Sequence, residues 1–273
     1  ISGPIFKLKN TQLHIYNCIF KNWRSQSGGT VIFFHMDSSF KDKWFTNDLT
    51  LVTKFSVFII GCSFFANQAT GIRSKSPGAI VKIQGGETFV KNCTFYNNHA
   101  HYLGGAIAIK HPGHRVHIFN TEFTKNVVKG MHAEIYYRWI DNRHNTRGGA
   151  IYIECTEDAN SKIVMNRNKF TSNGCDTGTG RYGYGYDQSY FNPRDTYIRP
   201  AEGGGAIYLS YCTNVSIVNS VFTENKGCLL GGALTATNIE YYSMMNVLLN
   251  KNSAFYQGGA VELFTEFYSL HNC

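Results

Sequence analysis

Two short motifs alternate along this chain, and they constrain its fold more than any other feature. A Gly-Gly-Ala-Ile-like tetrad occurs seven times, beginning at residues 28, 77, 104, 148, 204, 231 and 258. A Phe-x-x-Asn-like tetrad begins at residues 64, 95, 123, 170, 222 and 249, with a degenerate copy at residue 20. Without an insertion, successive copies lie 28 or 27 residues apart, as from Phe95 to Phe123 or Phe222 to Leu249. A fixed period of this length predicts a solenoid in which one repeat is one structural unit.

The residues before each Phe alternate between apolar and polar. Val116 and Ile118, for example, flank His117. This alternation predicts a strand with one buried face. A corner residue, mostly Asn, follows, and a further strand follows each Gly-Gly pair. Three short strands per coil, each stacked on its counterpart, predict an all-β fold: one parallel β-helix (β-solenoid) of about seven to eight coils over residues 1–273.

Three insertions are expected to leave the coils, near residues 34–50, 127–147 and 174–203. The second and third are rich in Tyr and leave the same turn of neighbouring coils. They are therefore interpreted as one interaction surface, with packing against the flank of the solenoid as the alternative. The candidate residues are Tyr136, Tyr137, Trp139, Tyr182, Tyr184, Tyr186, Tyr190 and Phe191.

The two motifs resemble the GGA(I/L/V) and FxxN repeats of the polymorphic outer membrane proteins, known from chlamydial surface autotransporters. The resemblance extends over nearly the whole chain. It implies a right-handed β-helix and a surface-exposed adhesive or structural role. Eight cysteines are many for a bacterial passenger segment. Related repeat arrays occur in surface proteins of some single-celled eukaryotes, so the organism stays open.

Charge and hydropathy exclude two classes of partner. The formal net charge is +8, but Lys and Arg are scattered without a run, so no nucleic-acid partner is expected. No apolar run is long enough for a membrane-spanning helix, so no direct membrane insertion is expected. The chain begins without Met and ends at Asn272-Cys273, which matches the start of another coil. It is therefore interpreted as an internal segment of a larger protein.

Position within the coil sorts the cysteines into candidate pairs. Cys155 and Cys212 occupy the same corner of successive coils, and Cys175 and Cys228 share another corner. One coil-to-coil step lies inside the usual disulfide range of about 4.4–6.8 Å between Cα atoms. We predict these two disulfides, and hence an oxidising compartment. Three further cysteines occupy one inward row, where at most one pair can form or all remain buried thiols: Cys18, Cys62 and Cys93.

No residue set predicts a catalytic, cofactor or metal site. Five histidines crowd into residues 99–117, but the coil arrangement scatters them over turns and an outward strand face. The outward positions of the strands after Gly-Gly, such as Lys82, Tyr152 and Tyr208, carry no stacked Asp. The chain is therefore not expected to be an enzyme. The alternative is a polysaccharide-binding or polysaccharide-degrading β-helix of the pectate-lyase type.

Two sequons are candidate glycosylation sites, Asn214-Val215-Ser216 and Asn92-Cys93-Thr94. Asn92 belongs to a corner ladder, so Asn214 is expected to be the more open of the two. Taken together, these features predict a secreted or cell-surface β-helix with a structural or adhesive role, for example within a filament or coat. Its expected partners are other extracellular proteins, further copies of itself or glycans, with no cofactor.

Overall fold

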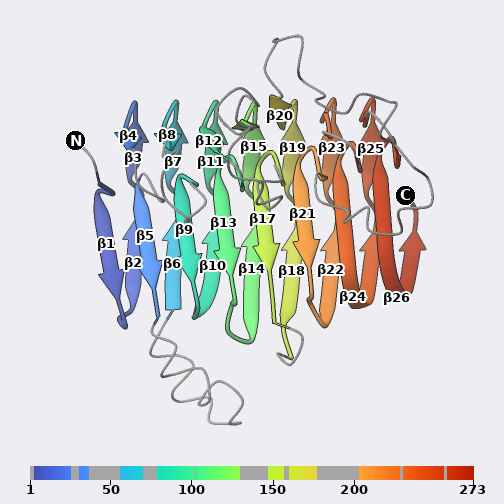
Figure 1. Cartoon of the computed structure of the whole chain (residues 1–273), viewed down its shortest axis with the longest axis horizontal. Helices are drawn as coiled ribbons and strands as arrows, with labels where there is room; N and C mark the ends of the chain where they lie inside the picture. The colour runs from blue at the N-terminus through green and yellow to red at the C-terminus, as the bar shows by residue number, and fades with distance from the viewer. Residues whose placement is uncertain are drawn as a thin grey trace, which may run out of the picture.

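A computed structural model of the chain describes residues 3–25, 31–36, 56–69, 79–101, 103–129, 147–156, 160–176, 203–227, 230–254 and 257–273. These residues form 26 strands and no helix. All described strand pairs are parallel, and each strand pairs with the equivalent strand of the next coil. Figure 1 shows the coils stacked from the blue N-terminal end to the red C-terminal end. The fold is a right-handed parallel β-helix, as predicted.

Four ladders of strands run along the solenoid. The first begins with β1 Phe6–Lys9 and continues with the strands that follow the Gly-Gly-Ala-Ile-like tetrads: β5 Ile32–His35, β9 Val81–Gln84, β13 Ile107–Lys110, β17 Ile151–Glu154 and β21 Ile207–Ser210. The second precedes the Phe positions: β2 Leu13–Tyr16, β6 Ser56–Ile60, β10 Glu87–Lys91, β14 Arg115–Phe119, β18 Lys162–Asn166 and β22 Asn214–Val218. Two long strands continue both ladders and join them into one 14-stranded sheet: β24 Leu234–Met245 and β26 Val261–His271.

The third ladder contains the Phe positions, and the fourth follows the motif Asn. The third comprises β3 Ile19–Lys21, β7 Ser63–Phe65, β11 Thr94–Tyr96, β15 Glu122–Thr124, β19 Lys169–Thr171, β23 Val221–Thr223 and β25 Leu248–Asn250. The fourth comprises β4 Arg24–Ser25, β8 Gln68–Ala69, β12 His99–His101, β16 Val127–Lys129 and β20 Gly174–Asp176. In Figure 1 these two ladders lie above the first two.

The fourth ladder corrects two expectations. The sequence predicted three strands per coil, whereas five described coils contain a fourth short strand. The predicted insertions at 127–147 and 174–203 therefore begin too early, because their first three residues belong to β16 and β20. The insertion at 34–50 also begins too early, because β5 extends to His35. Most of each insertion lies outside the described residues.

Stacked phenylalanine rings fill the core along the third ladder. Phe64, Phe95 and Phe123 are fully buried, and their ring centroids lie 4.5 and 5.0 Å apart. The near-parallel planes follow from the coil spacing of about 4.8 Å, which is close to the distance at which aromatic rings stack. Burial of one such side chain contributes about 1.5–3 kcal/mol, repeated in every coil.

The Asn of each Phe-x-x-Asn motif is buried and bridges coils. Asn126 Nδ2 donates to the carbonyl oxygen of Phe95 (2.8 Å) and to Asn173 Oδ1 (3.0 Å). Asn126 Oδ1 accepts hydrogen bonds from the backbone N–H of Asn98 (3.2 Å) and from Asn98 Nδ2 (2.9 Å). The same pattern recurs in neighbouring coils. This buried asparagine ladder satisfies backbone groups that the corner would otherwise leave unpaired inside the core.

A second asparagine ladder lies at the exposed corner three residues before each Phe. Asn120 Nδ2 donates to Asn92 Oδ1 at 3.0 Å, and Asn246 Nδ2 donates to Asn219 Oδ1 at 3.1 Å. These residues have φ between 45° and 54°, in the left-handed region that Asn tolerates. Both features explain why Asn is the most frequent residue at this corner.

The two glycines of each Gly-Gly pair meet different constraints. Gly104 has a φ of 55°, which a side chain would strain. Gly105 lacks space instead, because a Cβ there would overlap the carbonyl oxygen of Gly149 in the next coil. Close stacking of successive coils therefore requires the second glycine, in addition to the tight turn that requires the first.

Candidate interaction surfaces

An aromatic stripe lies on the outer face of the second ladder. Because side chains alternate along each strand, the residue between two buried ones faces outward, and in four successive coils it is aromatic. His14 stacks on Phe58 with ring centroids 4.6 Å apart, and Phe58 stacks on Phe89 at 4.8 Å. His117 meets Phe89 edge to face at 5.2 Å. We call His14, Phe58, Phe89 and His117 the aromatic stripe.

Apolar and cationic side chains flank the aromatic stripe. In the outward row two residues further along each strand lie Tyr16, which is 51% exposed, and the partly exposed Ile60 and Phe119. Three exposed cations also flank the stripe: Lys91, Arg115 and Lys162. This face therefore combines exposed ring edges with positive charge.

Burial and neighbouring charges shift the pKa values of two groups at the stripe, His117 and Glu87. The pKa of His117 is lowered by partial burial and by the neighbouring charges of Arg115 and Lys162. The carboxyl group of Glu87 lies 3.9 Å from Arg115 but is buried, and burial raises its pKa despite that cation. Glu87 is buried, whereas the exposed charged side chains of this face are the cations Lys91, Arg115 and Lys162.

The outward-pointing side chains of the first ladder are covered in the structure. Lys82, Tyr152 and Tyr208 occupy the outward side, as predicted, but each is at least 96% buried. The rings of Tyr152 and Tyr208 stack at 5.6 Å, and the guanidinium of Arg147 lies 4.9 Å from the Tyr208 ring centroid. Together with Ala79, Leu103 and Ala108 the two tyrosines form a second hydrophobic cluster outside the main core.

A hydrogen-bonded ion pair borders this second cluster. Tyr152 Oη donates to Glu154 Oε2 at 2.6 Å, and Lys110 Nζ lies 2.8 Å from the same oxygen. Burial would raise the pKa of Glu154, but Lys110 and the Tyr152 hydroxyl together lower it, so it stays ionised. Burial and the nearby Glu154 raise the pKa of Tyr152. An ionised carboxylate held between a cation and a neutral hydroxyl stabilises the face and supplies no available acid.

The eight aromatic residues that the sequence selected as a candidate surface lie outside the described residues: Tyr136, Tyr137, Trp139, Tyr182, Tyr184, Tyr186, Tyr190 and Phe191. That interaction surface stays a prediction. Sequence reasoning missed the aromatic stripe instead. The signal was the position six residues before each Phe, which is aromatic in the first four coils only: His14, Phe58, Phe89 and His117.

One segment with both motifs matches a known family of repeats. Residues 92–110 match the Chlamydia polymorphic membrane protein repeat. The chain carries a polymorphic membrane protein repeat. No curated protein and no solved structure matches the chain. The repeat match supports, at a coarse level, a location at the cell surface.

The 19 matched residues correspond to about two thirds of one 28-residue coil. They begin at the left-handed residue Asn92, continue through β11 and β12, and end with β13 at Lys110. They therefore contain one Phe-x-x-Asn motif and one Gly-Gly-Ala-Ile motif. Both motifs of the repeat have structural roles here, because the first supplies the ring stack and the buried asparagine ladder and the second supplies the close coil contact.

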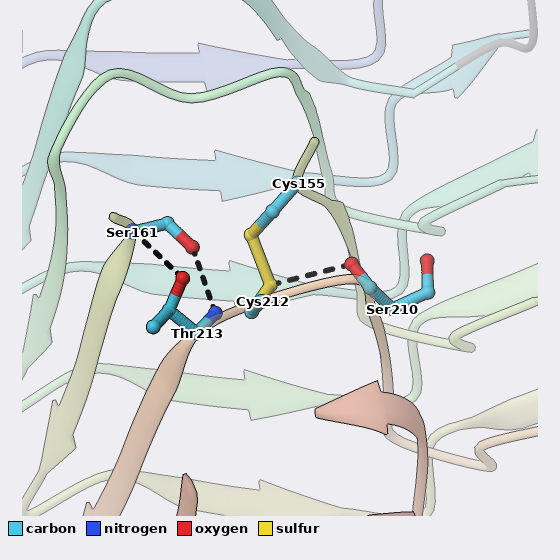
Figure 2. Close-up of a disulfide and its surroundings, with 5 residues drawn as sticks. All are labelled: Cys155, Ser161, Ser210, Cys212 and Thr213. Carbon is cyan, nitrogen blue, oxygen red and sulfur yellow. Dashed lines mark hydrogen bonds between the residues drawn. A yellow bond between two sulfur atoms is a disulfide. The ribbon is translucent and has the colours of Figure 1, made fainter. Parts of the chain in front are cut away.

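One predicted disulfide is present beside the second ladder. Cys155 and Cys212 are bonded, with Cα atoms 5.0 Å apart, across one step between coils (Figure 2). Next to it the Thr213 amide donates to Ser161 Oγ at 3.1 Å, and the Ser161 amide donates to Thr213 Oγ1 at 3.4 Å. Cys175 is also disulfide-bonded. Its predicted partner, Cys228, lies outside the described residues.

Both glycosylation candidates are exposed. Asn214 is the first residue of β22, and Ser216 of its sequon faces the same side of the strand. Asn92 Oδ1 accepts a hydrogen bond from Asn120, as the corner ladder predicts. In the preceding coil, however, Gly61 takes the ladder position and has no side chain to engage the Asn92 amide nitrogen. Asn92 is thus less engaged than predicted, and preferential glycosylation of Asn214 stays a prediction.

The clustered histidines separate in the structure. His99 and His101 lie in β12, not in the predicted turn, whereas His117 lies on the outward face of β14 as expected. Within the described residues, no group of three or more His, Cys, Asp or Glu side chains converges as metal ligands would. Nor does the described part of the chain contain a helix that is long and apolar enough to cross a membrane.

Proposed function

We propose that this chain is an extracellular, non-enzymatic β-helix of a cell-surface or secreted protein, with an adhesive or structural role, and that it makes contact through the aromatic stripe. The repeat match supports the surface location at a coarse level. The Cys155–Cys212 disulfide supports an oxidising compartment, because disulfides persist mainly outside the cytosol. The stripe carries the adhesive part of the proposal.

The geometry of the stripe favours one of the expected partner classes. Phe58 and Phe89 stack face to face, so their edges point outward and their faces are unavailable for sugar stacking. A symmetric contact between two copies would bring together two faces that both carry the exposed cations Lys91, Arg115 and Lys162. Aromatic and Arg side chains are enriched at protein interfaces, and aromatic ring edges are electropositive. An acidic, partly apolar surface of another extracellular protein fits this face best.

Attachment of coated beads to cultured epithelial cells tests this proposal. The double variant Phe58→Ser/Phe89→Ser removes the centre of the stripe, and Leu248→Ser is the matched control because Leu248 is 57% exposed on the third ladder. We expect several-fold weaker attachment for the double variant and no change for the control. Circular dichroism melting curves check that both variants fold.

Three results would contradict parts of the proposal. Attachment of the native chain no better than that of uncoated beads would remove the adhesive role. Equal attachment of both variants would assign the contact to another face. Competition by neutral polysaccharide but not by polyglutamate would favour the glycan-binding alternative.

Because Lys91 and Arg115 contribute exposed charge, attachment should also weaken as ionic strength increases.

A further inference from the structure

Three cysteine thiols lie in a single row along the solenoid axis. Cys18, Cys62 and Cys93 each precede a third-ladder strand, and those strands pair in register, Ile19 with Ser63 and Ser63 with Thr94. All three thiols are free. Neighbouring coils lie about 4.8 Å apart, within the range of Cα distances that disulfides span. The Cys155–Cys212 disulfide, with its Cα distance of 5.0 Å, shows that one such step can be bonded in this chain.

Access from solvent decreases along the row. Cys18 is partly exposed, whereas Cys62 is fully buried and Cys93 is 2% exposed. The backbone N–H of Cys18 donates to Cys62 Sγ at 3.5 Å. A dissolved oxidant can therefore reach the row at Cys18, and the other two sulfurs lie behind it inside the core.

The architecture of the row does not itself require thiols. The next members, Thr121, Asn168 and Ser220, each accept a hydrogen bond from the backbone N–H of the preceding coil through a side-chain oxygen, at 3.4, 3.1 and 3.2 Å. An oxygen acceptor therefore suffices at this position. Three successive cysteines supply redox chemistry that the other row members lack.

The middle sulfur is prepared to act as a nucleophile. A hydrogen bond with the Cys93 thiol lowers the pKa of Cys62 to about 6, against the opposing effect of burial and with help from the Cys18 amide. The same hydrogen bond, together with burial, raises the pKa of Cys93. Of these two thiols Cys62 is therefore the more easily deprotonated, and it lies between two potential disulfide partners. The thiolate is the species that attacks disulfides.

We propose that Cys18, Cys62 and Cys93 form a thiol relay, in which a small-molecule disulfide oxidises Cys18 and the oxidation ends as a Cys62–Cys93 disulfide inside the core. First, Cys18 attacks oxidised glutathione, forms a mixed disulfide and releases one glutathione thiolate. Cys62 then attacks the Cys18 sulfur and releases the second glutathione. Finally Cys93 attacks the Cys62 sulfur, and the Cys93 proton ends on the released Cys18 thiol.

The relay balances and suits the stacked geometry. Two protein thiols and one glutathione disulfide give one protein disulfide and two glutathione thiols. Each exchange step requires the attacking, central and leaving sulfurs to lie nearly in line. A row of side chains at equivalent positions of three coils provides that alignment along the solenoid axis. The product links the two neighbouring coils that contain Cys62 and Cys93, inside the core, and returns Cys18 to its free form.

A time course with oxidised glutathione and non-reducing peptide mapping by mass spectrometry tests the relay in the complete chain. We expect Cys62–Cys93 as the final product. Cys18→Ser should slow its formation at least tenfold, and Cys93→Ser should stop the sequence at Cys18–Cys62. Exposed Cys273 is the internal control, because it should be glutathionylated at the same rate in every variant. Melting curves confirm that the variants fold.

Two outcomes would overturn the relay. One is formation of Cys62–Cys93 at an unchanged rate in folded Cys18→Ser protein. The other is modification of Cys273 with no bond among the three row cysteines. If the chain is purified with Cys62–Cys93 already formed, reduced glutathione should open it through Cys18, and Cys18→Ser should resist opening. None of these results depends on bead attachment, so failure of the relay leaves the proposed adhesive role intact.

Discussion

Removal of one side chain from the buried asparagine ladder should cost far more than its size implies. Asn126→Ala leaves three buried groups without their partners: the backbone N–H of Asn98, one N–H of Asn98 Nδ2 and the carbonyl oxygen of Phe95. Each buried unsatisfied group costs about 1–3 kcal/mol. With partial relaxation, we expect a loss of roughly 3–5 kcal/mol in the free energy of unfolding.

The exposed corner ladder supplies the matched control. Asn120 makes one side-chain hydrogen bond to Asn92 and has a φ of 45°. Glycine adopts this conformation freely, so Asn120→Gly removes only an exposed hydrogen bond and should cost less than about 1 kcal/mol. Urea unfolding followed by circular dichroism compares the two variants.

A local measurement is also needed because solenoid coils can open separately. Amide hydrogen exchange should show that Asn126→Ala removes protection at Asn98, whose N–H loses its acceptor. Distant coils should keep their protection. Equal costs for Asn126→Ala and Asn120→Gly, or an unchanged exchange rate at Asn98, would refute the assignment of stability to the buried ladder.

Three further predictions concern the packing, the crosslink and the buried charge. Gly149→Ala should prevent folding because its Cβ meets backbone of the next coil, whereas Gly259→Ala should be tolerated because open space surrounds that position; soluble yield and melting curves compare them. Replacing Cys155 and Cys212 by Ser should lower stability by at most about 4 kcal/mol, the loop-entropy value for their separation of 57 residues, measured by urea unfolding. Burial and a neighbouring cation lower the pKa of Lys82 to about 8 in the folded protein. Above that pH the folded protein loses this proton before the unfolded chain does. Stability should increase as pH rises from about 8 towards 10, and Lys82→Met should remove the increase in urea unfolding series.

The repeat period was sufficient to predict the coil register. Phe95 and Phe123 were separated by one uninterrupted period, and they pair directly in the third ladder. The same argument located Cys155 and Cys212 at one corner, where they are bonded. Prediction succeeded where equivalent positions carry the same kind of residue, because stacking then repeats one set of contacts in every coil.

Prediction failed where a ladder has no common side-chain chemistry. β12 contains His-Ala-His, and the equivalent strand β16 contains Val-Val-Lys. Backbone hydrogen bonds hold these strands instead, such as His99 N–H to the carbonyl oxygen of Asn67 at 2.9 Å. Such bonds leave no periodic signal in a sequence.

Alternation also could not distinguish a covered outer face from an exposed one. Tyr152 and Phe89 both face outward from their strands, yet Tyr152 is 1% exposed and Phe89 is only partly buried. Local pattern determines which side of a strand points away from the core. Packing from elsewhere in the chain determines whether that side meets water, and no local pattern encodes it.

The equivalence of successive coils makes this architecture tolerant of recombination. Deletion of residues 95–122 removes one whole period of 28 residues and joins Thr94 to Phe123. Phe123 would then stack on Phe64 in place of Phe95, and the buried asparagine ladder would close in the same way. A gene for such a chain can therefore gain or lose whole coils without a new packing solution. Change in length is thus a milder event for this fold than change of one residue in a buried row.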